Sequence, residues 1–191
     1  MNGQEERQWI ARCQSGDREA FGPIVRAYMK RAYFTALGML GDSEEAYDIS
    51  QEAFVRAFRA IRGFDASHDF APWFFRILRN LCLTALAKRR ARSLESLEEM
   101  AEAGREPRAG DRFRPDLLAE RGEAVERVWR GLDALDPKSR EVIVLKDLEG
   151  YRYREIAEIL GVPIGTVMSR LFHARQKLKE KLMAGEGHRA V

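Results

Sequence analysis

The sequence of 191 residues has little cysteine and histidine and no long apolar run. Its two cysteines, Cys13 and Cys82, lie far apart, and its three histidines are scattered, so the spacing typical of a metal site or a disulfide framework is missing. No apolar stretch approaches the roughly 20 residues that cross a bilayer, and the N-terminus lacks the basic and apolar segments of a secretory signal. We therefore expect a cytoplasmic protein with reduced thiols and no bound metal.

The sequence also lacks the motifs that carry enzymatic chemistry. It has no glycine-rich phosphate loop and no nucleophile motif. His68 beside Asp69 comes nearest to a catalytic pair, and we interpret it as a loop contact instead. The sequence thus predicts no catalytic residue, no cofactor and no small-molecule substrate.

Neither sign of charge is in large excess. The chain has 33 lysines and arginines and 30 acidic residues, so its formal net charge is only +3. Any affinity for nucleic acid must therefore come from local clusters. Two basic clusters are present: Lys88, Arg89, Arg90 and Arg92, and Arg170, Arg175, Lys177, Lys179 and Lys181. A single run of this kind is more often a solvated helical face, so charge alone assigns no function.

The last third of the chain carries the most informative pattern. The stretch from Tyr153 to Arg175 is typical of a short helix, a turn and a second helix that runs into basic residues. Gly161 suits the left-handed conformation of such a turn, and Ala157 is small where the helices cross. Apolar residues placed to fill the wedge between the helices are Ile156, Leu160, Val162 and Val167. The pattern predicts a helix-turn-helix, whose second helix enters the DNA major groove.

The rest of the chain indicates an all-α protein with two small domains, because helical periods recur and no alternating strand is convincing. We predict an N-terminal domain over residues 1–91, a linker over 92–122, a helix-turn-helix domain over 123–184 and a tail over 185–191. The predicted linker is rich in charge, glycine and proline. Its first part, 93–103, is also compatible with a surface helix.

Within the N-terminal domain three helices are expected: one after an N-cap at Asp17, one from Ser43 to Arg62, and one opened by Pro72 and ending near Arg90. Pro23 predicts a kink or a late start in the first helix, because proline lacks the donor that a helix interior needs. Asp42 and Glu45 resemble a capping box for the second helix. In the C-terminal domain Asp136, followed by Pro137, is expected to cap the second of four helices.

Two faces of the N-terminal domain are candidate binding surfaces. Polar residues share one face of the helix 43–62, although an ordinary solvated face would look the same: Asp48, Gln51, Glu52 and Arg59. Aromatic, cationic and amide groups gather on the loop and helix 64–80, and they suit single-stranded DNA with an extruded base: Phe64, Ser67, His68, Asp69, Phe70, Trp73, Arg76 and Asn80. Trp73 fits packing and DNA contact equally well.

Two sets of motifs resemble one protein family, the extracytoplasmic-function (ECF) group of sigma-70-type sigma factors of bacterial RNA polymerase. The segments Asp48-Ile-Ser-Gln-Glu-Ala-Phe-Val-Arg-Ala-Phe58 and Phe70-Ala-Pro-Trp-Phe-Phe-Arg-Ile-Leu-Arg-Asn80 resemble sigma region 2. The segments Leu135-Asp-Pro137, Arg140-Glu-Val142 and Gly165-Thr-Val-Met-Ser-Arg-Leu-Phe-His-Ala-Arg175 resemble sigma region 4. The resemblance covers almost the whole chain, with the two sets in the family's order.

The resemblance implies a function for each surface. The polar face of the helix 43–62 would bind the clamp helices of the polymerase beta-prime subunit, and the beta flap of the polymerase is a further expected partner. The loop and helix 64–80 would capture the non-template strand of the melted minus-10 element. The residues expected at the duplex minus-35 element are Tyr153, Arg154, Thr166, Ser169, Arg170, Phe172, His173 and Arg175. An anti-sigma factor, often membrane-tethered in this family, is the expected inhibitor.

The sequence departs from the family pattern in three places. Met168 and His173 stand where many relatives carry arginine, which predicts fewer phosphate anchors, and Pro23 interrupts a helix that is usually continuous. The alternative function is a stand-alone helix-turn-helix regulator with an N-terminal helical sensor domain. A sensor has no reason to combine an acidic face with an aromatic and basic loop and helix, so the segment 48–80 favours the sigma factor.

Overall fold

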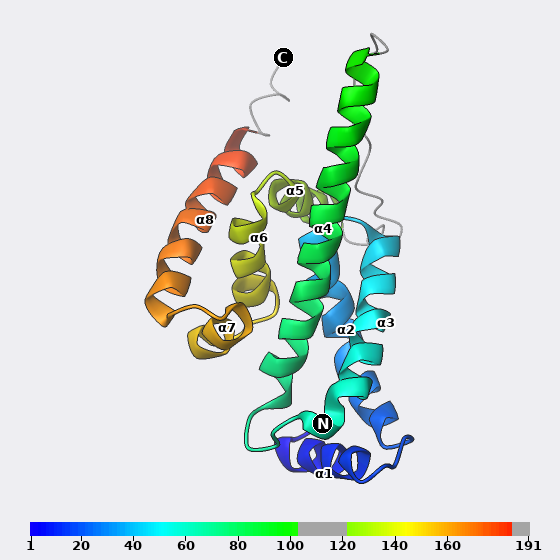
Figure 1. Cartoon of the computed structure of the whole chain (residues 1–191). Coiled ribbons are helices and arrows are strands. Elements are labelled where there is room, and N and C mark those ends of the chain that lie inside the picture. The colour runs from blue at the N-terminus through cyan, green and yellow to red at the C-terminus, as the bar shows by residue number, and fades with distance from the viewer. Residues whose placement is uncertain (103–121, 185–191) are drawn as a thin grey trace.

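The computed structural model describes residues 1–102 and 122–184, with side chains for 1–93 and 127–183, and within these ranges it contains helices and no strand (Figure 1). The N-terminal elements are α1 (Gly3–Gln14), α2 (Phe21–Leu40), α3 (Ser43–Ala60), the 3-10 turn η1 (Ile61–Gly63) and α4 (Phe70–Glu102). The C-terminal elements are α5 (Gly122–Asp133), α6 (Pro137–Ile143), the π-helical turn η2 (Val144–Leu148), α7 (Tyr153–Leu160) and α8 (Ile164–Ala184). The predicted all-α fold is confirmed.

Aromatic side chains fill the centre of the N-terminal unit. Phe74 of α4 has no exposed surface and stacks on Phe54 of α3, with 4.5 Å between ring centroids. Ile24 of α2 and Cys82 of α4 are equally buried, and burial raises the pKa of the Cys82 thiol to about 12. This interlocking core holds α4 against α2 and α3, and so fixes the position of the loop that precedes α4.

Helix α1 was not expected from the sequence. The Asn2 side chain accepts hydrogen bonds from the first turn of α1, and the Glu5 carboxylate accepts one from the Asn2 backbone N–H in return. At the other end of α1, Gln14 Nε2 donates to the backbone oxygens of Ile61 and Phe64, at 3.0 and 2.6 Å. Helix α1 thereby holds both the start of η1 and the start of the loop 64–69.

The predicted late start of α2 is confirmed. The helix begins at Phe21, so Pro23 lies in the first turn, where its missing donor costs no helical hydrogen bond. Asp17 does not cap α2. Its carboxylate accepts from the N–H groups of Glu19 and Ala20 in the turn before the helix, at 3.1 and 3.2 Å.

The start of α3 matches the prediction and that of α4 differs by one half-turn. Asp42 Oδ1 accepts from the Glu45 N–H at 2.8 Å, but the predicted capping box is only half formed, because the Glu45 carboxylate binds Arg89 of α4 and not the Asp42 N–H. Helix α4 begins at Phe70, before Pro72, and continues past the expected end near Arg90 to Glu102, so residues 93–102 of the helix considered for 93–103 are part of α4. The remainder of the predicted linker, 103–121, and the tail, 185–191, lie outside the described residues.

The C-terminal unit contains the predicted helix-turn-helix, formed by α7 and α8. Gly161 ends α7 in the left-handed conformation, with φ of 65°, and Ile156 and Val167 are completely buried between the helices. Asp136 caps α6, because its Oδ1 accepts from the Ser139 N–H at 3.0 Å. A nearby ammonium group, Lys177 Nζ at 2.8 Å, together with this cap lowers the pKa of Asp136 to about 2.

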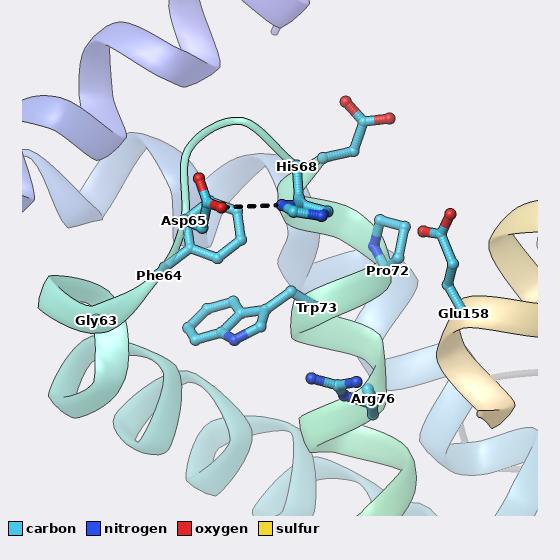
Figure 2. A pocket seen from close by; sticks show the side chains of 9 residues that line it. Gly63, Phe64, Asp65, His68, Pro72, Trp73, Arg76 and Glu158 are labelled. Carbon is cyan, nitrogen blue, oxygen red and sulfur yellow. Dashed lines mark ion pairs between the residues drawn. The ribbon is translucent and has the colours of Figure 1, made fainter.

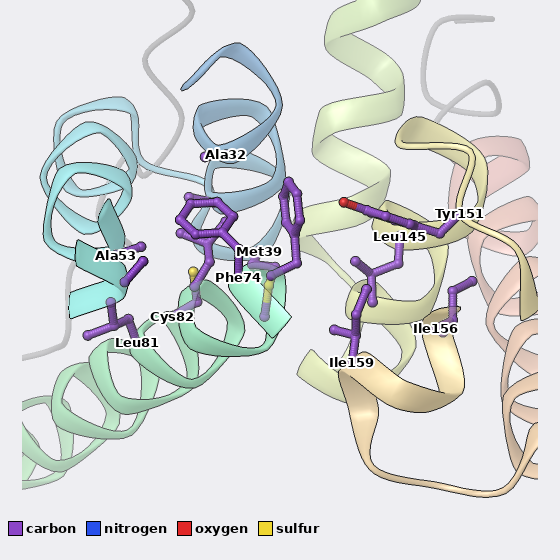
Figure 3. Close-up of a cluster of buried hydrophobic side chains, with 14 of the residues drawn as sticks. Ala32, Met39, Ala53, Phe74, Leu81, Cys82, Leu145, Tyr151, Ile156 and Ile159 are labelled. Atoms are coloured by element: carbon purple, nitrogen blue, oxygen red, sulfur yellow. The ribbon is translucent and has the colours of Figure 1, made fainter. Parts of the chain in front are cut away.

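The two units share one continuous core, which the sequence did not indicate (Figure 3). Helices α2 and α4 pack against α5, α6, η2 and α7. The ring of Phe75 on α4 meets the ring of Tyr151 edge-on, with 5.3 Å between centroids, and Arg140 Nη1 of α6 donates to the Met39 backbone oxygen of α2 at 3.0 Å. In this arrangement the helix-turn-helix lies beside α4 (Figure 1).

Candidate nucleic-acid interface

A cavity of about 510 Å³ lies where the loop 64–69 enters α4 (Figure 2). Its lining combines aromatic, acidic and cationic side chains with one residue of α7: Gly63, Phe64, Asp65, His68, Asp69, Pro72, Trp73, Arg76 and Glu158. Within the loop, Asp65 Oδ1 accepts from the Ser67 N–H at 2.9 Å, and Asp65 Oδ2 lies 3.4 Å from His68 Nδ1. These hydrogen bonds, the Ser67 N–H first, hold the pKa of Asp65 below its usual value.

Trp73 provides an aromatic wall of the cavity. Its side chain is half-buried and packs on Phe64 and Phe70, with ring centroids 4.8 and 5.5 Å away. Phe70 has no exposed surface and Phe64 only 6%, so both support Trp73 from below. Phe70, which the sequence predicted as a DNA contact, therefore cannot touch a ligand in this arrangement. Its role here is to hold Trp73 in place.

The structure gathers five of the eight residues predicted for the minus-10 element around one cavity: Phe64, His68, Asp69, Trp73 and Arg76. Ser67 lies in the same loop, with its Oγ 3.1 Å from His68 Nδ1, but does not line the cavity. Asn80 is exposed farther along α4 and accepts a hydrogen bond from Arg79 at 3.4 Å. Sequence reasoning missed Asp65 and Glu158; the position of Asp65 two residues before Ser67, typical of an Asx turn, could have indicated the first.

The polar face predicted on α3 contains exposed apolar side chains as well. Asp48, Gln51 and Arg59 are exposed, and Glu52 pairs with Arg56 one turn later, with 2.7 Å between Oε1 and Nε. Tyr47 and Val55 are 54% and 42% exposed. Sequence reasoning did not assign Tyr47, although its spacing of four from Gln51, and of eight from Val55, places all three on one side of the helix.

On α8, a groove of about 490 Å³ runs beside the predicted recognition residues. It is lined mainly by apolar and basic side chains: Tyr153, Met168, Leu171, Phe172, Arg175, Gln176 and Lys179. Phe172 is 60% exposed and Met168 53%. Ser169 and His173 are also exposed, Thr166 is half-buried, and Arg154 is exposed on α7 outside the groove.

Two predicted DNA-binding arginines of α8 have carboxylate partners within their own domain. Arg175 Nε donates to Asp147 Oδ2 at 3.0 Å, and Arg170 Nη1 lies 3.9 Å from Glu141 Oε1. The side chain of Arg175 is 51% exposed and that of Arg170 31%. Both guanidinium groups could exchange a carboxylate for a phosphate, which presents a similar pair of acceptor oxygens.

Comparison with known proteins assigns both halves of the chain to one protein family. Residues 24–92 match the family model for Sigma-70 region 2, and residues 126–178 match that for Sigma-70, region 4. The chain is 33% identical over 176 residues to the ECF RNA polymerase sigma factor SigW of Bacillus subtilis (strain 168), with 91% of this chain and 94% of SigW covered. The chain belongs to the ECF sigma factors of the sigma-70 family. The cavity is lined by region 2 of this sigma factor except for Glu158, which belongs to region 4 together with the rest of α7 and α8.

Other relatives agree with this family. The RNA polymerase sigma-H factor of Pseudomonas aeruginosa is 30% identical over 187 residues, with 95% of this chain and 96% of the relative covered. Among solved structures, CnrH in complex with the cytosolic domain of CnrY has a TM-score of 0.70 at 29% identity, covering 94% of this chain and 98% of CnrH. The sigma factor RpoE of Bartonella quintana, in complex with the anti-sigma factor NepR, shares the fold with a TM-score of 0.68 at 23% identity. No helix in the described part of this chain is long and apolar enough to span a membrane.

Proposed function

We propose that this ECF sigma factor binds core RNA polymerase and directs transcription to promoters with its own minus-10 and minus-35 elements. The observation that carries the proposal is the combination, in one chain, of a Trp73-walled cavity in region 2 and a basic helix-turn-helix in region 4. It acts as a specificity subunit and performs no chemistry itself, since polymerase supplies the catalytic centre.

The exposed face of α3 is the proposed contact with core polymerase. Asp48 and Gln51 lie beside the exposed apolar groups of Tyr47 and Val55. Such a mixture of apolar and polar groups is the composition of a protein–protein interface, whereas a purely solvated face has no need for Tyr47. The proposed partner surface is the pair of clamp helices of the beta-prime subunit, with Glu52 and Arg59 at the edge of the contact.

The region 2 cavity is the proposed site for an unpaired base of the minus-10 element. The base would stack on Trp73, because aromatic stacking stabilises single-stranded nucleic acid by about 1–3 kcal/mol per base. Carboxylates of Asp65 and Asp69 would accept hydrogen bonds from an exocyclic amino group of the base, as acidic residues do from the amino group of cytosine. Arg76 at the cavity edge supplies the cation for the adjoining phosphate.

The exposed side of α8 is the proposed reader of the minus-35 duplex. Ser169 and Arg175 offer hydrogen bonds to base edges or phosphate, and the exposed apolar side chains of Met168 and Phe172 suit contact with thymine methyl groups. Arg154, at the start of α7, and the lysines that follow Arg175 are placed for the phosphate backbone. An anti-sigma factor that covers these surfaces is the proposed inhibitor.

Run-off transcription tests the proposal. Purified bacterial core polymerase, the full chain and a promoter library randomised upstream of the start site would be incubated together, and the transcripts sequenced. The same reaction would use Asp48→Arg/Gln51→Ala and, as a matched charge reversal away from α3, Glu19→Arg, whose side chain is exposed in the turn before α2. We expect transcripts that share two spaced elements with the wild type and Glu19→Arg, and at least a 10-fold loss with the α3 variant.

Two results would contradict the proposal, the first its function and the second the role of α3. If the folded protein supports no transcription and does not bind core polymerase, while it binds duplex DNA tightly and specifically on its own in a mobility-shift assay, the chain is a stand-alone regulator. Equal transcription by the wild type and the α3 variant would instead remove α3 from the polymerase contact.

A further inference from the structure

The DNA-binding surfaces of regions 2 and 4 lie in one folded body in this structure. Helix α7 packs against α4, and Glu158 of α7 borders the region 2 cavity beside Pro72 (Figure 2). Glu158 is exposed and places a carboxylate at the edge of a cavity that already contains Asp65 and Asp69. A third negative charge there opposes the approach of a phosphate backbone.

This arrangement cannot serve both promoter elements at once. Elements centred near positions minus-10 and minus-35 are about 25 base pairs apart, which is ~85 Å along B-form DNA at 3.4 Å per base pair. A compact chain of 191 residues has a radius of gyration of only ~16 Å. If the chain reads both elements, as proposed above, regions 2 and 4 must separate first.

One buried carboxylate joins the two regions. Glu141 of α6 is 1% exposed, and Arg79 of α4 donates to both of its oxygens, Nε to Oε2 at 2.8 Å and Nη2 to Oε1 at 3.3 Å. The same Oε1 lies 3.9 Å from Arg170 Nη1 on the recognition helix. Glu141 therefore binds a cation of region 2 and holds back a predicted DNA-binding cation of region 4.

Other contacts seal the interface around this group. Arg31 of α2 donates to Glu149 Oε2 at 3.1 Å and lies over the ring of Tyr151, with its Cζ 4.6 Å from the ring centroid. Arg140, next to Glu141 in sequence, donates to the Met39 backbone oxygen at 3.0 Å. Arg31 is 40% exposed at its side chain, so its ion pair is partly screened by water, whereas Glu141 is shielded from water.

We propose that this arrangement is a self-inhibited state of the sigma factor, and that Glu141 is the latch that holds regions 2 and 4 together and withholds Arg170 from DNA. When regions 2 and 4 separate, water replaces the ion pair at both Arg79 and Glu141. The separation also releases Arg170 to bind promoter phosphate or a base edge. A surface that binds only the separated regions, such as core polymerase, shifts the equilibrium to the open state by its preference for that state.

The test measures the separation of the regions without polymerase or DNA. Donor and acceptor dyes would be attached to the full chain through Arg18→Cys before α2 and Lys181→Cys in α8, both exposed positions. The native thiols of Cys13 and Cys82 are buried and do not compete for the dyes. Single-molecule energy transfer then gives the open-to-closed ratio for the parent and for Glu141→Gln, which keeps the side-chain shape and removes the charge.

We expect one dominant high-transfer population in the parent, and an open-to-closed ratio at least about 10-fold higher in Glu141→Gln, because removing one partner of a buried ion pair is strongly destabilising to the contact. Arg79→Met, which acts from the other side of the interface, should raise the ratio in the same way even if Glu141→Gln fails to fold. Asp147→Asn is the matched control, since it removes the Arg175 ion pair within region 4 and should leave the ratio unchanged.

Two results would overturn the proposal. A parent protein that is already mostly low-transfer has no closed state to latch, and a high-transfer parent that neither variant opens is held by other contacts. Because this readout needs no transcription, its failure leaves the sigma activity standing, and a failure of the transcription assay leaves the closed state standing.

Discussion

Val144 lies so close to the backbone of Gly38 that a β-carbon at residue 38 would stand 2.7 Å from Val144 Cγ2. Gly38 is in the interior of α2, in region 2, and Val144 opens the π-helical turn of region 4. Glycine in a helix interior costs about 0.5–1 kcal/mol relative to alanine. The contact with Val144 explains why a small residue stands at this point, since any side chain there would push the two regions apart.

Gly38→Ala should therefore separate the regions while leaving region 2 folded. Alanine favours the helix, but its methyl group overlaps Val144, so we expect a several-fold rise in the open-to-closed ratio measured by energy transfer. Val144→Ala in the same chain removes the overlapping methyl groups and should return the ratio toward the parent value. An equally closed Gly38→Ala variant would show that α2 and η2 can shift without loss of the interface.

Trp73→Ala should weaken binding of the minus-10 strand, because the base would lose its stacking surface. A loss of ~1–3 kcal/mol corresponds to about 5- to 150-fold in affinity of the polymerase holoenzyme for a DNA fork with an unpaired minus-10 strand. Trp73→Phe keeps an aromatic ring and should restore most of the binding. Measuring unfolding of both variants by circular dichroism separates the DNA effect from lost packing on Phe64 and Phe70. Equal DNA affinity of a folded Trp73→Ala protein would contradict stacking at this position.

The sequence was sufficient to predict features whose causes are local. Asp42 and Asp136 cap the helices expected of them, Pro23 marks a late helix start, and Gly161 has the left-handed conformation required between α7 and α8. Each of these signals acts over four residues or fewer, so a single sequence contains all of the information. The same is true of Trp73 and Arg76, which one helical turn brings to the same cavity.

Features that depend on distant segments were not predicted. The Arg79 and Glu141 side chains meet although they are 62 positions apart, and nothing near either residue indicates the other. Gly38 did indicate that another segment packs closely against this helix, because an isolated glycine within a helical pattern usually has a packing reason. The burial of Phe70 beneath Trp73 was equally hidden, because both residues fit the periodicity of a core face and of a binding face.

Helix α1 is the exception, because its signal is local and was still missed: Asn2 and Glu5 have capping-box spacing.

The charge of Asp136 should stabilise region 4 in a pH-dependent way. Its pKa is about 2 in the folded state, mainly because of Lys177, and near 3.8 otherwise, so the stabilisation is complete above about pH 4 and is lost as the pH falls toward 2. The side chain is 45% exposed, which limits the effect to less than about 1 kcal/mol. Asp136→Asn retains an acceptor for the cap, so its unfolding free energy should fall below the parent's at pH 5 and approach it at pH 3. Lys177→Gln should behave likewise, and a pH-independent difference would contradict this linkage.

The two thiols should be unreactive in the folded protein. Cys13 is 4% exposed and Cys82 has no exposed surface, and burial raises the pKa of both, that of Cys82 to about 12. At pH 8 the thiolate fraction and its access to solvent are both low, so a charged disulfide reagent should react at least about 100-fold more slowly than with free cysteine. Denaturant should restore the full rate for two thiols. Rapid native modification of Cys82 would show that the α3–α4 core opens readily.

The most direct test of the whole account is transcription by core polymerase and this chain from a selected promoter and from the same promoter with 5 base pairs inserted between its two elements. If one chain reads both elements with its regions separated, the insertion rotates the minus-35 element by about half a turn of DNA and should reduce transcription at least about 10-fold. Transcription that depends on the chain but not on this spacing would contradict simultaneous reading by regions 2 and 4.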